Sequence, residues 1–151
     1  MRSAPNFVVM RTFSKAYALA GMRIGWCVAD PEVVDTLGQV ALPFTLTAMA
    51  QAAALAALDN EEVLSAQVRE TIAERERVLA VLGSAGYTVA ESRANFLWLP
   101  LGTRSQAFAD SCSAAGISVR CFSGEAVRVT IGTRAKNSSF LAVATSGRAS
   151  A

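Results

Sequence analysis

The chain has 151 residues, a formal net charge of +2 at pH 7 and 52% apolar residues. Its arginines are spread along the sequence, so no concentrated basic patch indicates nucleic-acid binding. With no histidine, and three cysteines that lack CxxC spacing, the sequence does not support a structural zinc site. We expect the cysteines to be reduced thiols, and no long apolar segment before Lys15 could serve as a signal peptide. Both points predict a cytoplasmic protein.

The first predicted elements surround a loop. An apolar run over residues 7–10 predicts a buried strand, residues 16–21 a brief helical turn or loop, and residues 24–29 a second strand. Asp30-Pro31-Glu32 then predicts a helix start, with a capping carboxylate, a proline at the first helical position and a further acid. This helix should extend to about Gln39.

Residues 36–58 contain no charged side chain, and this uncharged stretch is long enough to be considered as a membrane span. However, Pro43 interrupts the stretch, and its glutamines, threonines and many alanines are atypical of such spans. We therefore expect no membrane anchor but a buried or dimer-facing helix, capped by Thr45 or Thr47 and ending near Leu58.

Asp59-Asn60 predicts the start of a long amphipathic helix. Its apolar positions recur at three- and four-residue spacing and are Leu64, Val68, Ile72, Leu79 and Leu82. The positions expected on the opposite, solvated side are Arg69, Glu70, Glu74, Glu76 and Arg77. Gly83 and Gly86 should end this helix, which periodicity alone does not distinguish from a core helix of a bundle.

Strands and helices alternate in the remainder of the chain, which indicates an α/β fold. We expect strands over residues 96–100, 117–122 and 127–131. Helices are expected over residues 106–115, ended by Gly116, and over residues 139–144. The tail from Thr145 should be frayed.

The chain contains only two lysines, Lys15 and Lys136, against twelve arginines. An amine can lose its proton and become a nucleophile, whereas arginine stays protonated in proteins. A solvated surface lysine is the ordinary alternative. The neighbours of Lys15 favour chemistry, because the hydroxyls of Thr12 and Ser14 and the guanidinium of Arg23 could hold a phosphate at a fixed distance from the amine.

Other assignments of the same residues remain open at this point. Ser14-Lys15 could form a hydrolytic pair, although adjacent residues in extended backbone point to opposite faces. Arg128 could be a strand arginine paired with Glu125, and Asn95 could be a turn or strand-start residue.

Several motifs occur together in one order. They are Thr12-Phe13-Ser14-Lys15, Arg23-Ile24-Gly25-Trp26, Leu42-Pro43-Phe44, Ala94-Asn95-Phe96 and Val127-Arg128-Val129-Thr130-Ile131-Gly132-Thr133. Over roughly residues 4 to 145 the chain resembles the fold-type I aminotransferases that use pyridoxal 5'-phosphate, in the branch of the histidinol-phosphate and aromatic amino-acid (phenylalanine) enzymes. The resemblance implies amino-group transfer between an amino acid and a 2-oxo acid through a Schiff base with a lysine.

The resemblance also implies roles for individual residues. Lys15 corresponds to the lysine that binds the cofactor, and Thr12, Ser14 and Arg23 to ligands of its phosphate. Arg128 corresponds to the arginine that holds the substrate α-carboxylate, and Asn95 to an asparagine near the substrate. Arg120 aligns with a position that contacts the substrate phosphate in histidinol-phosphate enzymes. The short segment between Arg120 and Arg128 favours aromatic substrates instead.

The implied organisation is the C-terminal part of such a transferase. Residues 1–60 would belong to the large cofactor-binding domain, residues 61–86 to an interdomain helix and residues 87–145 to the small domain, with a disordered tail over 146–151. The family's glycine-rich turn, stacking ring and pyridinium aspartate precede the lysine, and residues 1–14 contain no Asp, Glu or Tyr.

We therefore expect a fragment with weak or no activity by itself, from a full-length enzyme that is a homodimer. The alternatives are an inactive remnant or dimerisation module, or another fold-type I enzyme, such as a lyase or acyl-condensing synthase.

Overall fold

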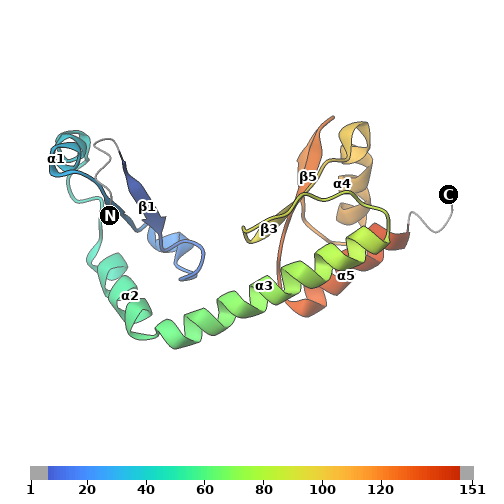
Figure 1. The fold of residues 1–151 in the computed structure, drawn as a ribbon, viewed down its shortest axis with the longest axis horizontal. Helices are drawn as coiled ribbons and strands as arrows, with labels where there is room; N and C mark the ends of the chain where they lie inside the picture. Colours follow the sequence, from blue (N-terminus) through green and yellow to red (C-terminus); the bar gives the residue numbers. More distant parts are fainter. Residues whose placement is uncertain (1–6, 147–151) are drawn as a thin grey trace. The chain divides into compact units, whose positions relative to one another are not determined.

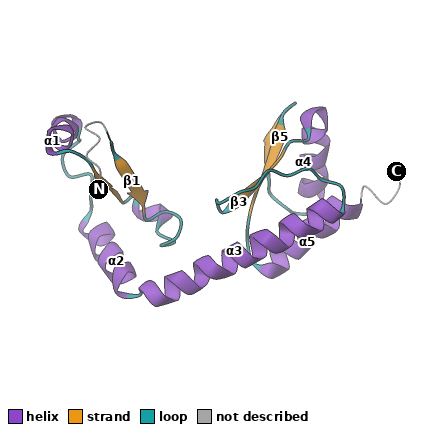
Figure 2. Ribbon diagram, in the orientation of Figure 1, coloured by secondary structure: helices purple, strands orange, loops and turns teal. Residues whose placement is uncertain are grey.

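The structure, a computed structural model, describes residues 7–146. The chain contains both helices and strands (Figures 1 and 2). The elements are β1 (Val9–Thr12), η1 (Ala20–Met22), β2 (Gly25–Val28), α1 (Pro31–Val40), α2 (Ala48–Asp59), α3 (Glu61–Ser84), β3 (Phe96–Leu99), η2 (Gly102–Arg104), α4 (Ser105–Ala114), β4 (Arg120–Phe122), β5 (Ala126–Thr130) and α5 (Arg134–Ser146). Contacts divide the chain into two units, Met1–Gln67 and Val68–Ala151, and the division falls inside α3. The predicted domain boundaries at residues 60 and 86 stay predictions.

The first unit contains an antiparallel pair of strands, β1 and β2, in which Thr12 lies opposite Gly25. The expectation of a buried strand over residues 7–10 is wrong in position and in burial. β1 begins at Val9, and Met10 is 75% exposed. Among the described residues this sheet has two strands only, so most side chains on both of its faces remain accessible to water.

The two helices that follow begin at the predicted caps. Asp30 Oδ1 accepts a hydrogen bond from the Glu32 amide at 3.1 Å, with Pro31 as the first residue of α1. At α2, Thr47 rather than Thr45 is the cap, since its Oγ1 accepts from the Ala50 amide at 3.1 Å. Within the described range, no helix has the combination of length and apolar character needed to cross a membrane.

The second unit is built on a three-stranded antiparallel sheet in the order β3-β5-β4. One face of this sheet packs against α3, α4 and α5 and forms the hydrophobic core. The fully buried members of that core are Val78, Leu82, Leu97, Leu99, Cys112 and Val127. The opposite face carries the alternate residues of the strands, which include Trp98, Arg120 and Arg128.

Helix α4 ends before Gly116 as predicted, and α3 ends before Gly86, but the prediction that Gly83 stops α3 is wrong because the helix continues to Ser84. Gly86 and Gly116 follow them with φ angles of 78° and 74°, the left-handed conformation that glycine adopts without steric cost. The strand predicted over residues 117–122 is shorter, because the Ile117 amide instead donates to the Cys112 carbonyl at 2.8 Å and helps to end α4. Helix α5 is longer than predicted and includes Ser146. Residues 147–151 of the predicted tail lie outside the described residues.

The assignment of Glu74 to a solvated side of the long helix is wrong. Its side chain is buried, and it accepts three hydrogen bonds from Arg77 in a forked arrangement, one from Asn137 at 3.0 Å and one from Arg134 at 3.3 Å. The hydrogen bonds from Arg77 and Asn137 lower the pKa of Glu74 to about 2. Asn137 also bonds the Gly132 amide and carbonyl, each at 2.9 Å. Glu74 thus joins α3 to the segment that follows β5.

Candidate functional site

The loop between β1 and β2 carries Lys15 and is anchored by Phe13. Phe13 is buried, and its ring contacts the Tyr17 ring with 4.6 Å between centroids. Its amide donates to the Ile24 carbonyl at 3.2 Å, and its carbonyl accepts from the Leu19 amide at 3.0 Å. These contacts close the loop over the end of the two strands, so that residues 12–15 and Arg23 are held in one small region.

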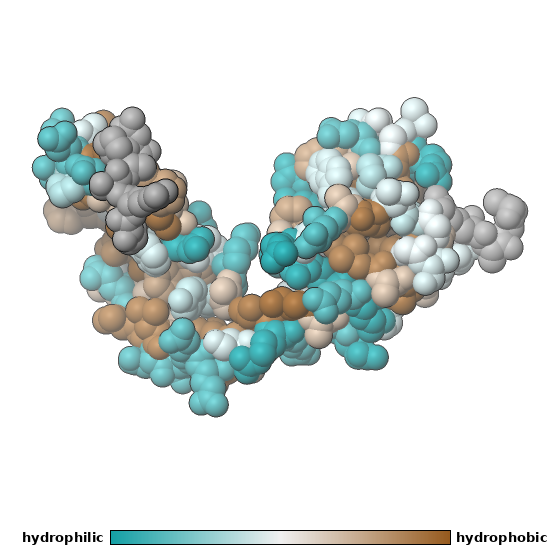
Figure 3. Space-filling model, in the orientation of Figure 1, coloured by the Kyte–Doolittle hydropathy of each residue, from teal (hydrophilic) through white to brown (hydrophobic). Residues whose placement is uncertain are grey.

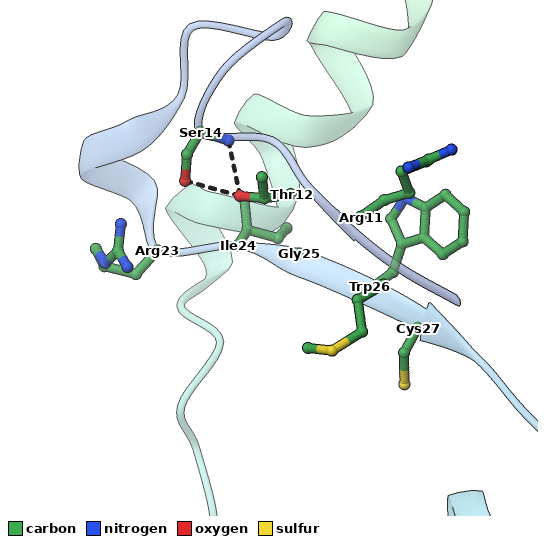
Figure 4. A pocket seen from close by; sticks show the side chains of 9 residues that line it. Arg11, Thr12, Ser14, Arg23, Ile24, Gly25, Trp26 and Cys27 are labelled. Atoms are coloured by element: carbon green, nitrogen blue, oxygen red, sulfur yellow. Dashed lines mark hydrogen bonds between the residues drawn. The ribbon is translucent and has the colours of Figure 1, made fainter. Parts of the chain in front are cut away.

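Two hydroxyls face each other at the end of β1. Thr12 Oγ1 donates to Ser14 Oγ at 2.8 Å and accepts from the Ser14 amide at 3.0 Å (Figure 4). A hydroxyl can rotate to donate to a new acceptor. This pair therefore presents two adjustable donors, which suits an anion with several oxygen atoms.

Arg23 lies between η1 and β2, and its backbone has a left-handed φ of 53°. Such a conformation is unfavourable for a residue with a Cβ and is often associated with functional sites. Its Nη1 donates to the Ala20 carbonyl at 2.6 Å, so part of the guanidinium is fixed by the loop.

Thr12, Ser14 and Arg23 line one open cleft of about 400 Å³ (Figure 4). None of the residues that line it is acidic; the others are Met10, Arg11, Ile24, Gly25, Trp26 and Cys27. The cleft therefore combines hydroxyl donors with positive charge, which is the donor set that binds a phosphate group.

Gly25 keeps β2 close to β1 beside the hydroxyl pair. A Cβ at this position would lie 2.7 Å from the Arg11 carbonyl oxygen, closer than real Cβ atoms approach backbone. Sequence reasoning included Gly25 in a motif but assigned it no role. The close contact becomes visible only when the strand register is known.

Lys15 follows Ser14 in the turn and is exposed. Its carbonyl accepts from the Ala18 amide at 3.0 Å, but it is not among the residues that line the cleft. Its side chain makes no hydrogen bond or ion pair with the described residues. The structure therefore brings the three predicted phosphate ligands together and places the lysine next to them in sequence, with its amine unengaged.

The predicted substrate residues belong to the second unit. Arg128 on β5 lies directly opposite Arg120 on β4. Arg128 does not pair with Glu125 or with any other described acid, which excludes the structural ion pair considered above. Its Nε is buried without a hydrogen-bond partner, and its guanidinium carbon lies 5.2 Å from the Phe96 ring centroid. A buried donor left unpaired is costly, so a ligand with an acceptor oxygen would complete this position.

Asn95 precedes β3, and its carbonyl accepts from the Ile131 amide at 2.9 Å. Its half-buried side-chain amide has no hydrogen-bond partner among the described residues. Arg75, to which the sequence assigned no role, donates from Nη1 to the Ala94 carbonyl at 2.9 Å. Ser92 Oγ accepts from the Ala94 amide and donates to the Phe96 carbonyl. These bonds fix the backbone on both sides of Asn95.

A comparison with known proteins identifies the family. The model of the class I and II aminotransferases matches residues 1–143, and the chain belongs to this family. An aromatic amino acid aminotransferase of Rhodococcus erythropolis is 55% identical over 95% of this chain, and one of Mycobacteroides abscessus is 52% identical over 93%. The chain spans about two fifths of the length of these relatives, 40% and 41%.

A solved structure has the same fold. The histidinol-phosphate aminotransferase of Sinorhizobium meliloti, crystallised in complex with pyridoxal-5'-phosphate, matches with a TM-score of 0.83 and 27% identity, over 93% of this chain and 40% of that chain. The predicted fold, part of a fold-type I aminotransferase, is thus confirmed.

Proposed function

We propose that this chain carries the cofactor-binding lysine of an aminotransferase that exchanges an amino group between an aromatic amino acid and a 2-oxo acid. The observation that carries the proposal is the cleft that Thr12, Ser14 and Arg23 line together, with Lys15 directly after Ser14 in the chain. The names of the relatives, aromatic amino acid aminotransferases at 52–55% identity, support the aromatic substrate over histidinol phosphate.

The residues present fit pyridoxal 5'-phosphate. Its phosphate would be held by the two hydroxyls and the Arg23 guanidinium, a donor set with no competing acid in the cleft. Lys15 is the amine that would bind the cofactor aldehyde. When bound, the cofactor supplies the electron sink that makes the substrate α-proton removable.

The remaining steps belong to side chains of the protein. Arg128 would hold the substrate α-carboxylate through its guanidinium, and the unpaired Nε is consistent with a missing acceptor. Asn95 would contact the bound molecule through its free amide. The Lys15 amine would take the proton from the α-carbon of the amino acid and give it back later in the amino-group transfer. A fixed carboxylate orients the bond to be broken.

We further propose that the full-length enzyme is a cytoplasmic homodimer. Cys27, Cys112 and Cys121 are free thiols, which fits a reducing compartment. The outward-facing apolar side chains of α2, such as Met49 and Leu55, would be covered by the rest of the chain or by a second subunit. Sedimentation of the full-length protein tests the dimer.

The cofactor site is tested by reductive trapping. The chain is incubated with pyridoxal phosphate, reduced with borohydride and digested, and the modified lysine is located by mass spectrometry. Because there are only two lysines, Lys136 is an internal reference. We expect modification at Lys15 to exceed that at Lys136 by about tenfold, a difference in binding of about 1.4 kcal/mol. Lys15→Ala should abolish specific modification, and Lys136→Ala should leave it unchanged. Equal modification of both lysines contradicts the proposal.

The reaction class needs a second measurement. The loaded protein is mixed with L-phenylalanine, and phenylpyruvate is measured by chromatography in a single turnover. We expect phenylpyruvate in less than stoichiometric amount from the wild type and none from Lys15→Ala. Trapping at Lys15 without any keto acid from the full-length protein would retain the cofactor site but overturn the transferase assignment.

A further inference from the structure

Two guanidinium groups contact the segment around Asn95, one on each side of it in sequence. Among the described residues, the buried side-chain nitrogen atoms that lack a hydrogen-bond partner are Arg75 Nε and Arg128 Nε. Arg75 lies on α3 and Arg128 on β5, and neither forms an ion pair with a described acid. Burying part of a charged group without an acid is costly, so stability alone does not account for either residue.

Arg75 holds the residue that precedes Asn95. Its Nη1 donates to the Ala94 carbonyl at 2.9 Å and so joins α3 to a segment nineteen positions later in the chain. The guanidinium is planar and rigid, so one bond at Nη1 also restricts the position of Nε. Arg75 is half-buried, and a hydrogen bond that is partly shielded from water is stronger than one in open solvent. Arg75 therefore sets how the Ala94 carbonyl lies relative to α3.

Ser92 ties the residues around Asn95 into one unit. Its Oγ accepts from the Ala94 amide at 3.2 Å and donates to the Phe96 carbonyl at 2.7 Å. The Asn95 carbonyl accepts from the Ile131 amide at 2.9 Å, and Phe96 is the first residue of β3. Because these bonds leave the segment little freedom, a shift of the Ala94 carbonyl is passed through the backbone to Phe96.

The Phe96 ring supports the Arg128 guanidinium. The guanidinium carbon of Arg128 lies 5.2 Å from the ring centroid, within the range of favourable cation–π contacts. Trp98 of β3 lies directly opposite Arg128, and its ring contacts the Phe122 ring with 4.8 Å between centroids. Arg128 is thus held by a ring and not by an acid, which leaves its donors available for a carboxylate. Its position depends on where Phe96 lies.

We propose that Arg75 is a positioning residue for the carboxylate contact at Arg128. From α3 it holds the Ala94 carbonyl, the backbone then fixes Phe96, and the Phe96 ring places the Arg128 guanidinium. The same backbone carries Asn95, whose orientation toward the bound molecule depends on the same bond. The inference rests on the proposed function, which supplies the carboxylate at Arg128, and it adds the residue of α3 on which the placement of that contact depends.

The first measurement needs no ligand. The Arg128 Nε–H group is buried, so its proton should exchange slowly with water, and nuclear magnetic resonance of the isotope-labelled chain measures this exchange at mildly acidic pH. Arg75→Met keeps an unbranched apolar side chain but removes the donor to Ala94, and we expect it to speed exchange at Arg128 about tenfold. Arg75→Lys keeps one donor and should remain within about threefold of the wild type. Slow exchange that Arg75→Met loses and Arg75→Lys retains is the signature of positioning.

Tyr87→Phe is the matched control, because it removes a different hydrogen bond of the second unit. This bond runs from the Tyr87 hydroxyl to the Ala144 carbonyl at 2.8 Å and does not involve residues 92–96. Urea denaturation gives the stability lost in each variant. We expect Tyr87→Phe to lose stability as Arg75→Met does but to keep exchange at Arg128 within about twofold of the wild type. Equal acceleration in both variants, or none in Arg75→Met, overturns the positioning role.

Ligand binding separates this inference from the proposed function. 3-Phenylpropionate, an aromatic carboxylate without an amino group, is titrated into the full-length protein by calorimetry. We expect Arg75→Met to weaken binding about tenfold and Arg75→Lys to recover most of the affinity. Trapping of pyridoxal phosphate at Lys15 should be unchanged in both variants, because Lys15 belongs to the other contact unit.

These titrations have distinct outcomes. If binding depends on Arg128 but Arg75→Met retains the wild-type affinity, the positioning role is overturned and the carboxylate contact stands. If 3-phenylpropionate does not bind, or Arg128→Ala changes nothing, the carboxylate contact of the proposed function fails, and the inference fails with it.

Discussion

The two contact units of this chain bury their apolar residues to very different extents. In the second unit, α3, α4 and α5 enclose a continuous core against the β3-β5-β4 sheet. In the first unit the buried apolar residues of the described range are Phe13, Ala50 and Ala54, while Phe44 is 99% exposed. Figure 3 shows apolar side chains on the surface in the region of α2.

This difference separates two kinds of functional residue. The predicted carboxylate contact, Arg128, is held by a sheet whose own core fixes its register. The predicted cofactor contacts lie on a two-stranded ribbon and a loop that the described residues cover only in part. We therefore expect the geometry of the second unit to depend on its own core, and that of the first to depend on a few local contacts, notably at Phe13 and Gly25.

The largest expected effect is the loss of core packing in the second unit. Leu97→Ala removes a fully buried side chain from the core face of β3 and should cost about 2–5 kcal/mol of unfolding free energy. Leu55→Ala, at a position that is 64% exposed in the first unit, should change it by less than about 0.5 kcal/mol. Urea denaturation followed by circular dichroism measures both. Comparable losses would contradict the difference between the units.

The next largest effect is a loss of stability of the second unit at acidic pH. The hydrogen bonds to Glu74 hold its pKa in the folded state at about 2, below the ordinary value of 4.5. A lowered pKa stabilises the fold above the unfolded-state value, and this stabilisation is lost as pH falls from about 4.5 towards 2. The urea midpoint should therefore decrease over this range.

Glu74→Gln should flatten the decrease and lower the midpoint at neutral pH, because a neutral amide cannot accept the forked contact from Arg77 equally well. Glu70→Gln, on the exposed side of the same helix, is the matched control and should follow the wild-type profile. A profile of Glu74→Gln that coincides with the wild type would show that the network does not stabilise the fold.

A smaller, local effect is expected in the first unit. Gly25→Ala places a Cβ against the Arg11 carbonyl and should push β1 away at Thr12, so trapping of pyridoxal phosphate at Lys15 should fall severalfold. Gly38→Ala in α1 meets no atom within 4 Å and should stabilise that helix by about 0.5–1 kcal/mol. Unchanged trapping in Gly25→Ala would mean that the strand contact does not set the hydroxyl pair.

The smallest expected effect is a stabilisation. Ala18 has a left-handed φ of 55°, which costs an L-residue roughly 1–2 kcal/mol. Ala18→Gly should relieve this cost, partly offset by the greater freedom of glycine in the unfolded chain, with a net gain of roughly 0.5 kcal/mol. Differential scanning calorimetry can detect such a shift, and a lower melting temperature would show that the loop has no strain at this residue.

The sequence predicted most elements and the family but not the contacts that complete the site. Helix caps and stops are local signals, so the sequence alone indicates them. They are the caps at Asp30 and Thr47 and the stops at Gly86 and Gly116. Glu74 was misassigned because its partners Arg134 and Asn137 lie about sixty residues later. The Trp98–Phe122 contact depends on strand register, which alternation within single strands does not specify.

The most direct test of the central claim is whether the phosphate group directs the cofactor to Lys15. Trapping is compared for pyridoxal phosphate and pyridoxal, in the wild type and in a Thr12→Ala/Ser14→Ala variant. The account predicts that the phosphate raises the ratio of Lys15 to Lys136 modification by about tenfold in the wild type and leaves it nearly unchanged in the variant. A ratio that is independent of the phosphate, or a variant that retains the wild-type preference, would contradict it.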